Sequence, residues 1–138
     1  MSQPLRVLVV GSDEPGRRAL IEALAQAGVH GEPVATLDAL EARAALGAGA
    51  EPGADGPFDP DAILAAHGLG ALDGFAALNW VQQRHPDWPV LLYDRSPTVE
   101  TTIRAIHGGA HDLLRWPGPA DPLVAAVRRA ARQRHSSR

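Results

Sequence analysis

The 138-residue sequence contains no cysteine and no lysine. Without cysteine there is no disulfide framework, no thiolate zinc site and no cysteine nucleophile. Purely apolar stretches are also short, at four or five residues each, whereas a helix that spans a bilayer needs about 20. The first four residues lack the basic start of a signal peptide. These absences predict a cytoplasmic protein with no membrane contact.

The charge of the chain is unevenly distributed, and every basic residue is an arginine. Residues 1–127 hold eight arginines against sixteen acids, whereas residues 128–138 hold five arginines and no acid. Such a basic end contacts nucleic acid or an acidic partner in some proteins. More often it is the solvated face of a last helix, where arginine suits the negative end of the helix dipole. We favour the helix face and expect no nucleic-acid binding by this chain alone.

Strand and helix patterns alternate along the chain without an internal repeat. Short apolar or β-branched runs predict strands at 5–10, 32–36, 61–66, 89–93 and 111–114. Helical spacing predicts helices at 15–27, 37–46, 74–85, 98–107 and 121–134. Strict alternation with short connections implies an α/β fold, with five parallel strands in a doubly wound sheet and helices on both faces. We expect one domain over residues 1–134, a flexible loop at about 47–60 and a tail at 135–138.

The glycine-rich stretches do not meet the requirements of nucleotide sites. The glycine spacing at 11–16 is that of a phosphate-binding loop, but that loop needs Lys and Ser or Thr where Arg17 and Arg18 stand. A second stretch at 68–70 lacks the third glycine of a dinucleotide fingerprint, because Asp73 occupies that position. We expect no nucleotide cofactor.

Histidine and serine positions offer no stronger site. His107 and His111 are four residues apart, but two glycines between them break the helix that would align two metal ligands. Ser12 or Ser96 with His67 would imitate a hydrolase pair, yet the sequence has no Gly-x-Ser-x-Gly elbow. We therefore expect no metal, no cofactor and no enzymatic activity.

Three stretches, together with the alternation, resemble the CheY-like receiver domain of bacterial two-component response regulators. Residues 70–75 read Gly-Ala-Leu-Asp-Gly-Phe, similar to the family's loop ending in Met-Asp-Gly. Residues 84–92 read Arg-His-Pro-Asp-Trp-Pro-Val-Leu-Leu, similar to its third helix and fourth strand. Residues 108–117 read Gly-Gly-Ala-His-Asp-Leu-Leu-Arg-Trp-Pro, similar to its Gly-Ala-x-Asp-Tyr-Leu-x-Lys-Pro stretch. The likeness covers residues 5–132 and implies a flavodoxin-like (βα)5 fold with strand order 2-1-3-4-5.

The resemblance implies a phosphotransfer site, but the polar residues of that site are missing. The family uses two acids that hold Mg²⁺, an acceptor aspartate, a Thr or Ser and a lysine, because the metal and the lysine neutralise charge on the phosphoryl oxygens. In that order the positions fall on Gly11, Ser12, Ala66, Asp94 and Trp116, and the aromatic switch position falls on Leu113. A shifted register moves Asp13 or Ser96 into the site but supplies neither lysine nor acceptor. We interpret the chain as a pseudo-receiver with a degenerate phosphorylation pocket of Gly11, Ser12, Asp13, Ala66, Asp94 and Trp116.

Two interpretations of this pocket remain open. In one, Trp116 fills the space over Gly11 and Ala66 and donates its indole N–H to a partner such as Asp94, which pairs with Arg95 or Arg115. In the other, the loops simply drifted after the site lost its chemistry. The family's lysine–proline bond is cis, and an X-Pro bond costs only about 0.5–1 kcal/mol in that form. The resemblance therefore predicts a cis bond between Trp116 and Pro117.

The resemblance also implies a signalling face, built by the helix at 98–107, the strand at 111–114 and the helix at 121–134. Its charged residues are Arg104, Asp112, Arg128, Arg129 and Arg132. Asp112 against Arg128 or Arg129 of a second copy would form reciprocal ion pairs in a two-fold dimer. We expect this module to bind a protein partner (a kinase, an output domain or a second copy) without phosphorylation. The alternatives are the regulatory domain of a larger transcriptional or cyclic-nucleotide regulator, and an enzyme or small-ligand binder that uses the remodelled pocket.

Overall fold

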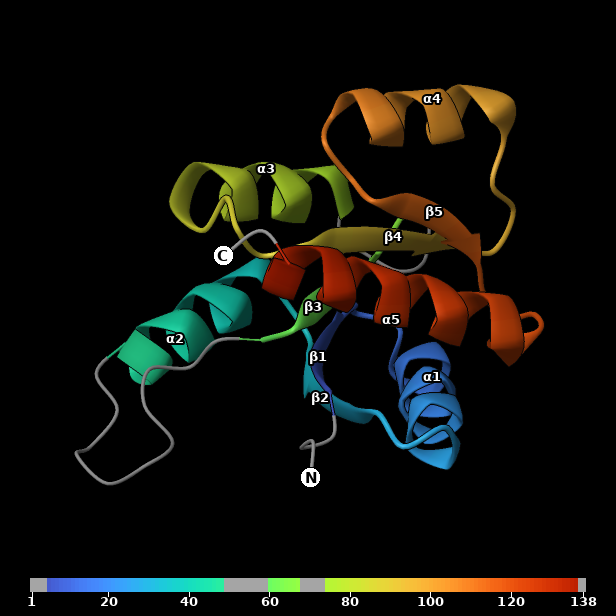
Figure 1. Cartoon of the computed structure of the whole chain (residues 1–138), viewed down its shortest axis with the longest axis horizontal. Coiled ribbons are helices and arrows are strands. Elements are labelled where there is room, and N and C mark those ends of the chain that lie inside the picture. Colours follow the sequence, from blue (N-terminus) through green and yellow to red (C-terminus); the bar gives the residue numbers. More distant parts are fainter. Residues whose placement is uncertain (1–4, 49–59, 68–73, 137–138) are drawn as a thin grey trace.

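The structure is a computed structural model of the chain, and it describes residues 5–48, 60–67 and 74–136. The loop expected at 47–60, the end of the expected tail, the glycine stretch at 68–70 and Asp73 lie wholly or mostly outside the described residues. Strands and helices alternate five times (Figure 1). The strands are β1 (Arg6–Val10), β2 (His30–Val34), β3 (Ala62–Ala66), β4 (Val90–Asp94) and β5 (Asp112–Arg115). The helices are α1 (Glu14–Gln26), α2 (Leu37–Ala48), α3 (Gly74–Arg84), α4 (Val99–His107) and α5 (Ala120–Ser136).

All paired strands run parallel, in the order β2-β1-β3-β4-β5. The predicted fold class and strand order are therefore confirmed. β3 and β4, in the middle of the sheet, are buried at every position, as expected for parallel strands covered on both faces. The largest error in the predicted bounds is at β2, which was expected at 32–36. It begins earlier because His30 donates its backbone N–H to Leu5 and pairs with Arg6.

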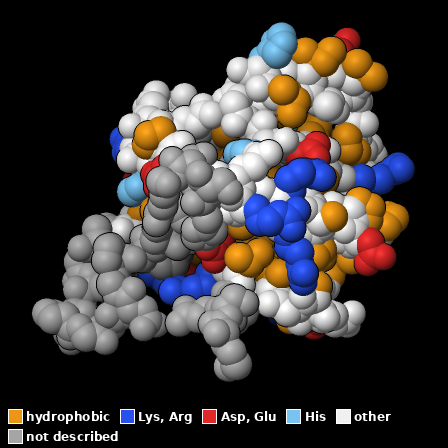
Figure 2. Space-filling view, viewed as in Figure 1, with side chains coloured by type: hydrophobic (Ala, Val, Ile, Leu, Met, Phe, Trp, Pro, Cys, Tyr) orange, Lys and Arg blue, Asp and Glu red, His pale blue; other side chains and the backbone are white. Residues whose placement is uncertain are grey.

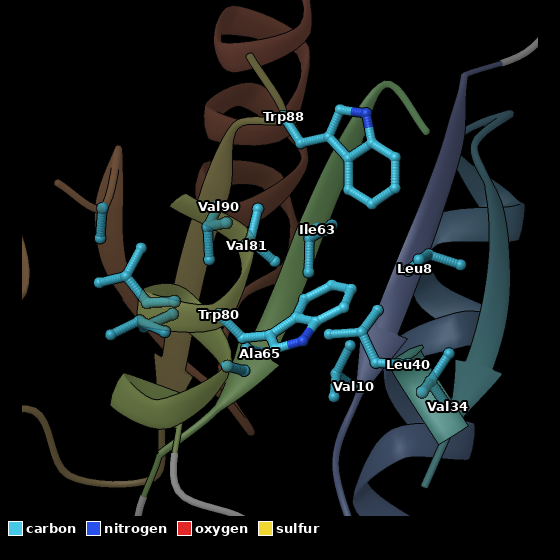
Figure 3. Packing of buried hydrophobic residues seen from close by; sticks show 14 of the residues in the cluster. Leu8, Val10, Val34, Leu40, Ile63, Ala65, Trp80, Val81, Trp88 and Val90 are labelled. Carbon is cyan, nitrogen blue, oxygen red and sulfur yellow. The ribbon is translucent and has the colours of Figure 1, made fainter. Parts of the chain in front are cut away.

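Alternate residues of each strand point to opposite faces of the sheet and separate the interior into two cores. One core joins the sheet to α2 and α3, and Figure 3 shows Trp80 of α3 lying against Ala65 and Leu40 within it. The other core joins the sheet to α1 and α5, with Val9, Leu64 and Leu91 at its centre. Of the helices that the structure describes, none is long and apolar enough to cross a membrane.

Local signals explain where several helices begin and end. The side chain of Asp13 accepts the backbone N–H of Gly16 at 3.2 Å and caps the start of α1. Thr98 and Thr101 form a capping box at the start of α4. Gly28, just after α1, has a φ of 81°, which glycine adopts without the steric cost of a Cβ. The caps at Asp13 and Thr98 lie in the loops after β1 and β4, which parallel pairing places at the same edge of the sheet.

Candidate functional site

The positions predicted to form a degenerate pocket do meet at the carboxyl edge of the sheet. Gly11 follows β1, Ala66 ends β3 and Asp94 ends β4, so parallel pairing places all three at one edge. A side chain at Gly11 would begin 3.2 Å from the Cβ of Ala66. Trp116 follows β5 at the same edge, and its backbone N–H donates to the carbonyl of Asp94 at 2.9 Å.

The space over Gly11 and Ala66 is occupied by Tyr93, which was not among the predicted site residues. Tyr93 pairs with Ala66 across the β3–β4 ladder, and its phenol extends over β3 toward β1. Its hydroxyl oxygen and ring carbon Cζ lie 2.6 and 3.7 Å from the point where a Cβ on Gly11 would be. The residue is almost completely buried, with 2% of its surface exposed. Two small neighbours therefore leave room for one large side chain, which comes from the adjacent strand.

Burial also changes the acidity of this phenol. Loss of hydration raises the pKa of Tyr93 to about 12, because the phenolate is the form that needs water. The positive charge of Arg17 lowers that pKa and the negative charge of Asp13 raises it, both by less than burial does. Tyr93 is thus a neutral side chain at physiological pH and contributes no nucleophile to the pocket.

The charged groups of the loop after β1 are engaged in holding that loop. Asp13 caps α1, as described above, and the guanidinium of Arg17 donates to the carbonyl of Gly11. Ser12 is half-buried and also has an interaction partner. An arginine on the carbonyl of Gly11 puts a fixed positive charge at the β1 end of the edge, the end where the resemblance implies two metal-binding acids.

Trp116 matches its prediction in part. The Trp116–Pro117 bond is cis, as predicted. The indole is buried, with 7% of the residue exposed, and it belongs to the α1–α5 core. Its position over Gly11 and Ala66 was predicted wrongly, because Tyr93 takes that place. Its N–H donates to the carbonyl of Gly16 at 3.2 Å and not to Asp94, since the indole reaches the first turn of α1.

Asp94 is the buried charged residue of the described core, but it does not pair as predicted. Its carboxylate turns back onto its own loop and accepts the backbone N–H of Ser96 at 3.2 Å. The guanidinium of Arg115 instead donates to the carbonyl of Arg95 at 3.4 Å. The expected pairing of Asp94 with Arg95 or Arg115 is therefore wrong. Asp94 and Arg115 each bond to a backbone group of the loop after β4 instead.

No cluster of three metal-ligating side chains is found within residues 5–48, 60–67 and 74–136. The two carboxylates at this edge, Asp13 and Asp94, each accept a backbone N–H. Ala66 supplies no carboxylate at the expected acceptor position. In chemical terms the described edge holds a neutral phenol, an indole, an arginine and two engaged carboxylates. The loops at this edge are thus packed around buried aromatic side chains, and their carboxylates bond to backbone N–H groups.

The residues expected on the signalling face divide between two sides of the molecule. Asp112 and Arg129 form an ion pair of 3.9 Å within the chain, and Arg132 is exposed on the same helix as Arg129. Arg128 points to the other side of α5, where it donates to the carbonyl of Ala27 at the end of α1. Arg104 lies 4.1 Å over the ring of Phe75 in α3. The predicted face is corrected accordingly, because a turn of 100° between neighbouring helix residues sends Arg128 and Arg129 to different surfaces.

α4 exposes an apolar stripe that charge-based reasoning overlooked. Val99, Ile103 and Ile106 recur at helical spacing and are 76%, 51% and 46% exposed. Ala105 is the buried residue of this helix, so the stripe does not face the sheet. Figure 2 shows hydrophobic atoms over α4 and a column of arginine side chains over α5 on one face of the molecule. The spacing 99, 103 and 106 was visible in the sequence, but the exposure was not.

Comparison with known proteins gives a consistent result. The chain is 32% identical over 125 residues, or 91% of its length, to the C4-dicarboxylate transport transcriptional regulatory protein DctD of Pseudomonas aeruginosa, of which it covers 25%. It is 35% identical over 71 residues, or 51% of its length, to the DNA-binding transcriptional regulator NtrC of Escherichia coli, of which it covers 15%. The chain thus spans a quarter or less of these curated relatives. No protein-family model matches it.

Solved structures extend the similarity to the whole fold. The receiver domain of NtrX from Brucella abortus is 25% identical, with a TM-score of 0.75 over 91% of this chain and 98% of that domain. A CheY-like receiver domain protein from Methanospirillum hungatei is 15% identical, with a TM-score of 0.76 over 98% of this chain and 99% of that one. The βα alternation and the strand order give the chain the fold of a CheY-like response regulator receiver domain, and it is similar to such domains over nearly its whole length.

Proposed function

We propose that the chain is a pseudo-receiver, a non-enzymatic signalling module that works without phosphorylation. The observation that carries this proposal is the occupied pocket, in which Tyr93 fills the space over Gly11 and Ala66. Phosphoryl transfer needs an acceptor, a metal and a cation placed to stabilise developing charge. Here Ala66 stands at the acceptor position and Trp116 at the lysine position, and Tyr93 fills the space beside Ala66 and over Gly11. A domain with such a filled pocket acts by binding a partner and not by catalysing phosphoryl transfer.

The interaction surface of this module is the apolar stripe of α4 together with the exposed charges of β5 and α5. When a partner covers an apolar stripe on a helix, the buried apolar surface stabilises the complex by roughly 25 cal/mol per Å². Asp112 and Arg129 lie on the same face and are themselves paired only loosely at 3.9 Å. Such exposed pairs contribute about 0–1 kcal/mol each and set the orientation of a partner more than its affinity.

Of the three candidate partners, a kinase, an output domain and a second copy of the chain, this face fits the second copy best. In a two-fold dimer, Asp112 of each copy would face Arg129 of the other, so the ion pair would form twice. The same axis would bring the α4 stripes of the two copies together. Arg128, the predicted alternative to Arg129, does not take part in this contact because its guanidinium donates to the carbonyl of Ala27 at the end of α1.

Sedimentation of the purified chain over a range of concentrations tests this proposal. Ile103→Glu places a charge within the stripe and should weaken self-association at least tenfold. Gln83→Glu adds the same charge on an exposed position of α3 and should leave it unchanged. Equal behaviour of the two variants, or a wild-type chain that stays monomeric, would remove the second copy as the partner.

A second candidate is the regulatory domain of a larger regulator, transcriptional or cyclic-nucleotide-related. The observation that favours the transcriptional form is the identity of the relatives, DctD and NtrC, which are described as transcriptional regulators and are four or more times longer than the matched part. In such a protein, α4, β5 and α5 would contact an output domain. The full reading frame of the gene distinguishes the two candidates: an output domain encoded after residue 138 favours this one.

A further inference from the structure

A groove of about 490 Å³ lies between α1 and the first half of α5, the two helices that cover one face of the sheet (Figure 1). Its apolar lining consists of small side chains that are all at least partly open to solvent: Ala23, Ala27, Ala120, Val124 and Ala125. Small side chains at a contact allow a second helix to approach closely. The groove is therefore an accessible apolar surface, separate from both the Tyr93 pocket and the α4 stripe.

Two opposite charges of α5 also line this groove. Asp121 is exposed in the first turn of the helix and forms no hydrogen bond or ion pair with the described part of the chain. Arg128 is exposed further along the helix, and its guanidinium donates to the backbone carbonyl of Ala27. This bond holds the guanidinium beside the groove, and no carboxylate among the described residues pairs with its charge. Both charges are thus available to a partner.

The order of these residues along α5 is self-complementary. Asp121 and Arg128 are about two helical turns apart, so they lie on one side of α5 with about 10 Å between them along its axis. Val124 and Ala125 lie midway between the two charges. If a second α5 crosses antiparallel at this midpoint, Asp121 of each copy faces Arg128 of the other. The same arrangement sets Val124 against Ala125, and the two-fold axis forms every contact twice.

We propose that the α1–α5 groove is a docking site for a second copy of this chain, with the two α5 helices antiparallel. Charge complementarity selects this occupant, because a copy presents the same two charges in reverse order. The contact does not depend on the proposed function, since it uses Arg128 and not Arg129 or the α4 stripe. Its small side chains bury less apolar area than the stripe does, so it is the weaker of the two contacts. A chain that uses both contacts assembles beyond a dimer.

Sedimentation of the Ile103→Glu chain isolates this contact, because that variant disables the α4 stripe. This background should still dimerise, at higher concentrations than the wild type, and salt at about 1 M should weaken the dimer by screening its ion pairs. Asp121→Arg or Arg128→Asp, added to the background, turns two attractive pairs into two repulsive ones. Each should weaken dimerisation by about tenfold or more. Glu41→Arg makes the same charge change as Asp121→Arg at an exposed position of α2, on the other face of the sheet, and should have no effect.

A mixture of the two charge variants tests the antiparallel arrangement directly. The Asp121→Arg chain offers two arginines to the two aspartates of the Arg128→Asp chain, so the mixture should form a one-to-one dimer that neither variant forms alone. The proposal is overturned if salt has no effect, if the mixture associates no better than its components, or if the background stays monomeric at millimolar concentration. The last result would leave the groove to a helix of a different protein. Failure of the α4 proposal gives another pattern, in which Ile103→Glu associates like the wild type and Asp121→Arg does not.

Discussion

The hydroxyl of Tyr93 stands above Gly11, 2.6 Å from the place where any side chain at that position would start. The two residues come from different strands, with β3 between them. Ala66 on β3 is small enough for the phenol to pass over it. This relationship explains why the edge of the sheet is filled although Gly11 has no side chain and that of Ala66 is small, and it leads to the first two predictions.

Gly11→Ala should destabilise the fold by about 1–3 kcal/mol, the usual cost of adding a methyl group to a well-packed site. The added Cβ meets the Tyr93 hydroxyl first, so a Tyr93→Phe background should recover most of that loss. Urea denaturation of the two single variants and the double variant measures the coupling. An equal cost of Gly11→Ala in both backgrounds would show that Tyr93 is not the obstacle.

Stability should fall as pH rises from about 10 to 12. An unfolded tyrosine loses its proton near pH 10, whereas the pKa of Tyr93 in the fold is raised to about 12. Between these values the folded chain holds one proton more than the unfolded chain, so alkali favours unfolding. The contribution is fully present below pH 10, and roughly 2–3 kcal/mol is lost by the time pH passes 12.

Tyr93 is the single tyrosine of the sequence, so its phenolate absorbance reports its titration directly. The midpoint should lie near pH 12 in the folded chain and near pH 10 in urea. In Tyr93→Phe, the part of the alkaline stability loss due to this group should disappear. A midpoint near 10 in the folded chain would mean that the phenol is accessible to water.

Trp116→Lys should loosen the domain without restoring phosphotransfer. The substitution removes a buried indole and its hydrogen bond to Gly16, which together are worth about 3 kcal/mol for a large aromatic side chain. Trp116→Phe keeps a ring in the core and should cost less than half as much. Thermal unfolding of the two variants gives the comparison. A Lys variant as stable as the wild type would contradict the packing role of the indole.

Acetyl phosphate should leave no acyl phosphate on this chain. Neither wild type nor Ala66→Asp should gain the mass of a phosphoryl group, because the variant still lacks a lysine and still has Tyr93 over the site. Intact-mass spectrometry provides the measurement, with the receiver domain of NtrX treated in parallel as a test of the reagent. A base-labile phosphoryl group on wild type would overturn the pseudo-receiver proposal, and one on Ala66→Asp alone would show that only the acceptor is missing.

The sequence was sufficient to predict the order of strands and helices and to identify the polar residues that the pocket lacks. Buried strands and amphipathic helices leave periodic patterns along the chain, so the alternation and the βα order were readable from local spacing. The absence of lysine needs no alignment, and Ala66 could be counted from the glycine-rich loop that follows it. The cis bond at Trp116–Pro117 followed from the resemblance, since a proline in that position was already in the sequence.

Tertiary structure alone decided which side chains use the available space. β4 is apolar or buried at every position, so its sequence does not show which face Tyr93 occupies or that its neighbours on β3 and β1 are small. Arg128 and Arg129 are adjacent and chemically identical, yet one binds α1 and the other pairs with Asp112. The stripe on α4 carries the spacing of a core face, and only the position of the helix leaves it in water. Periodicity is a local property, whereas the partner of each face depends on residues far along the chain.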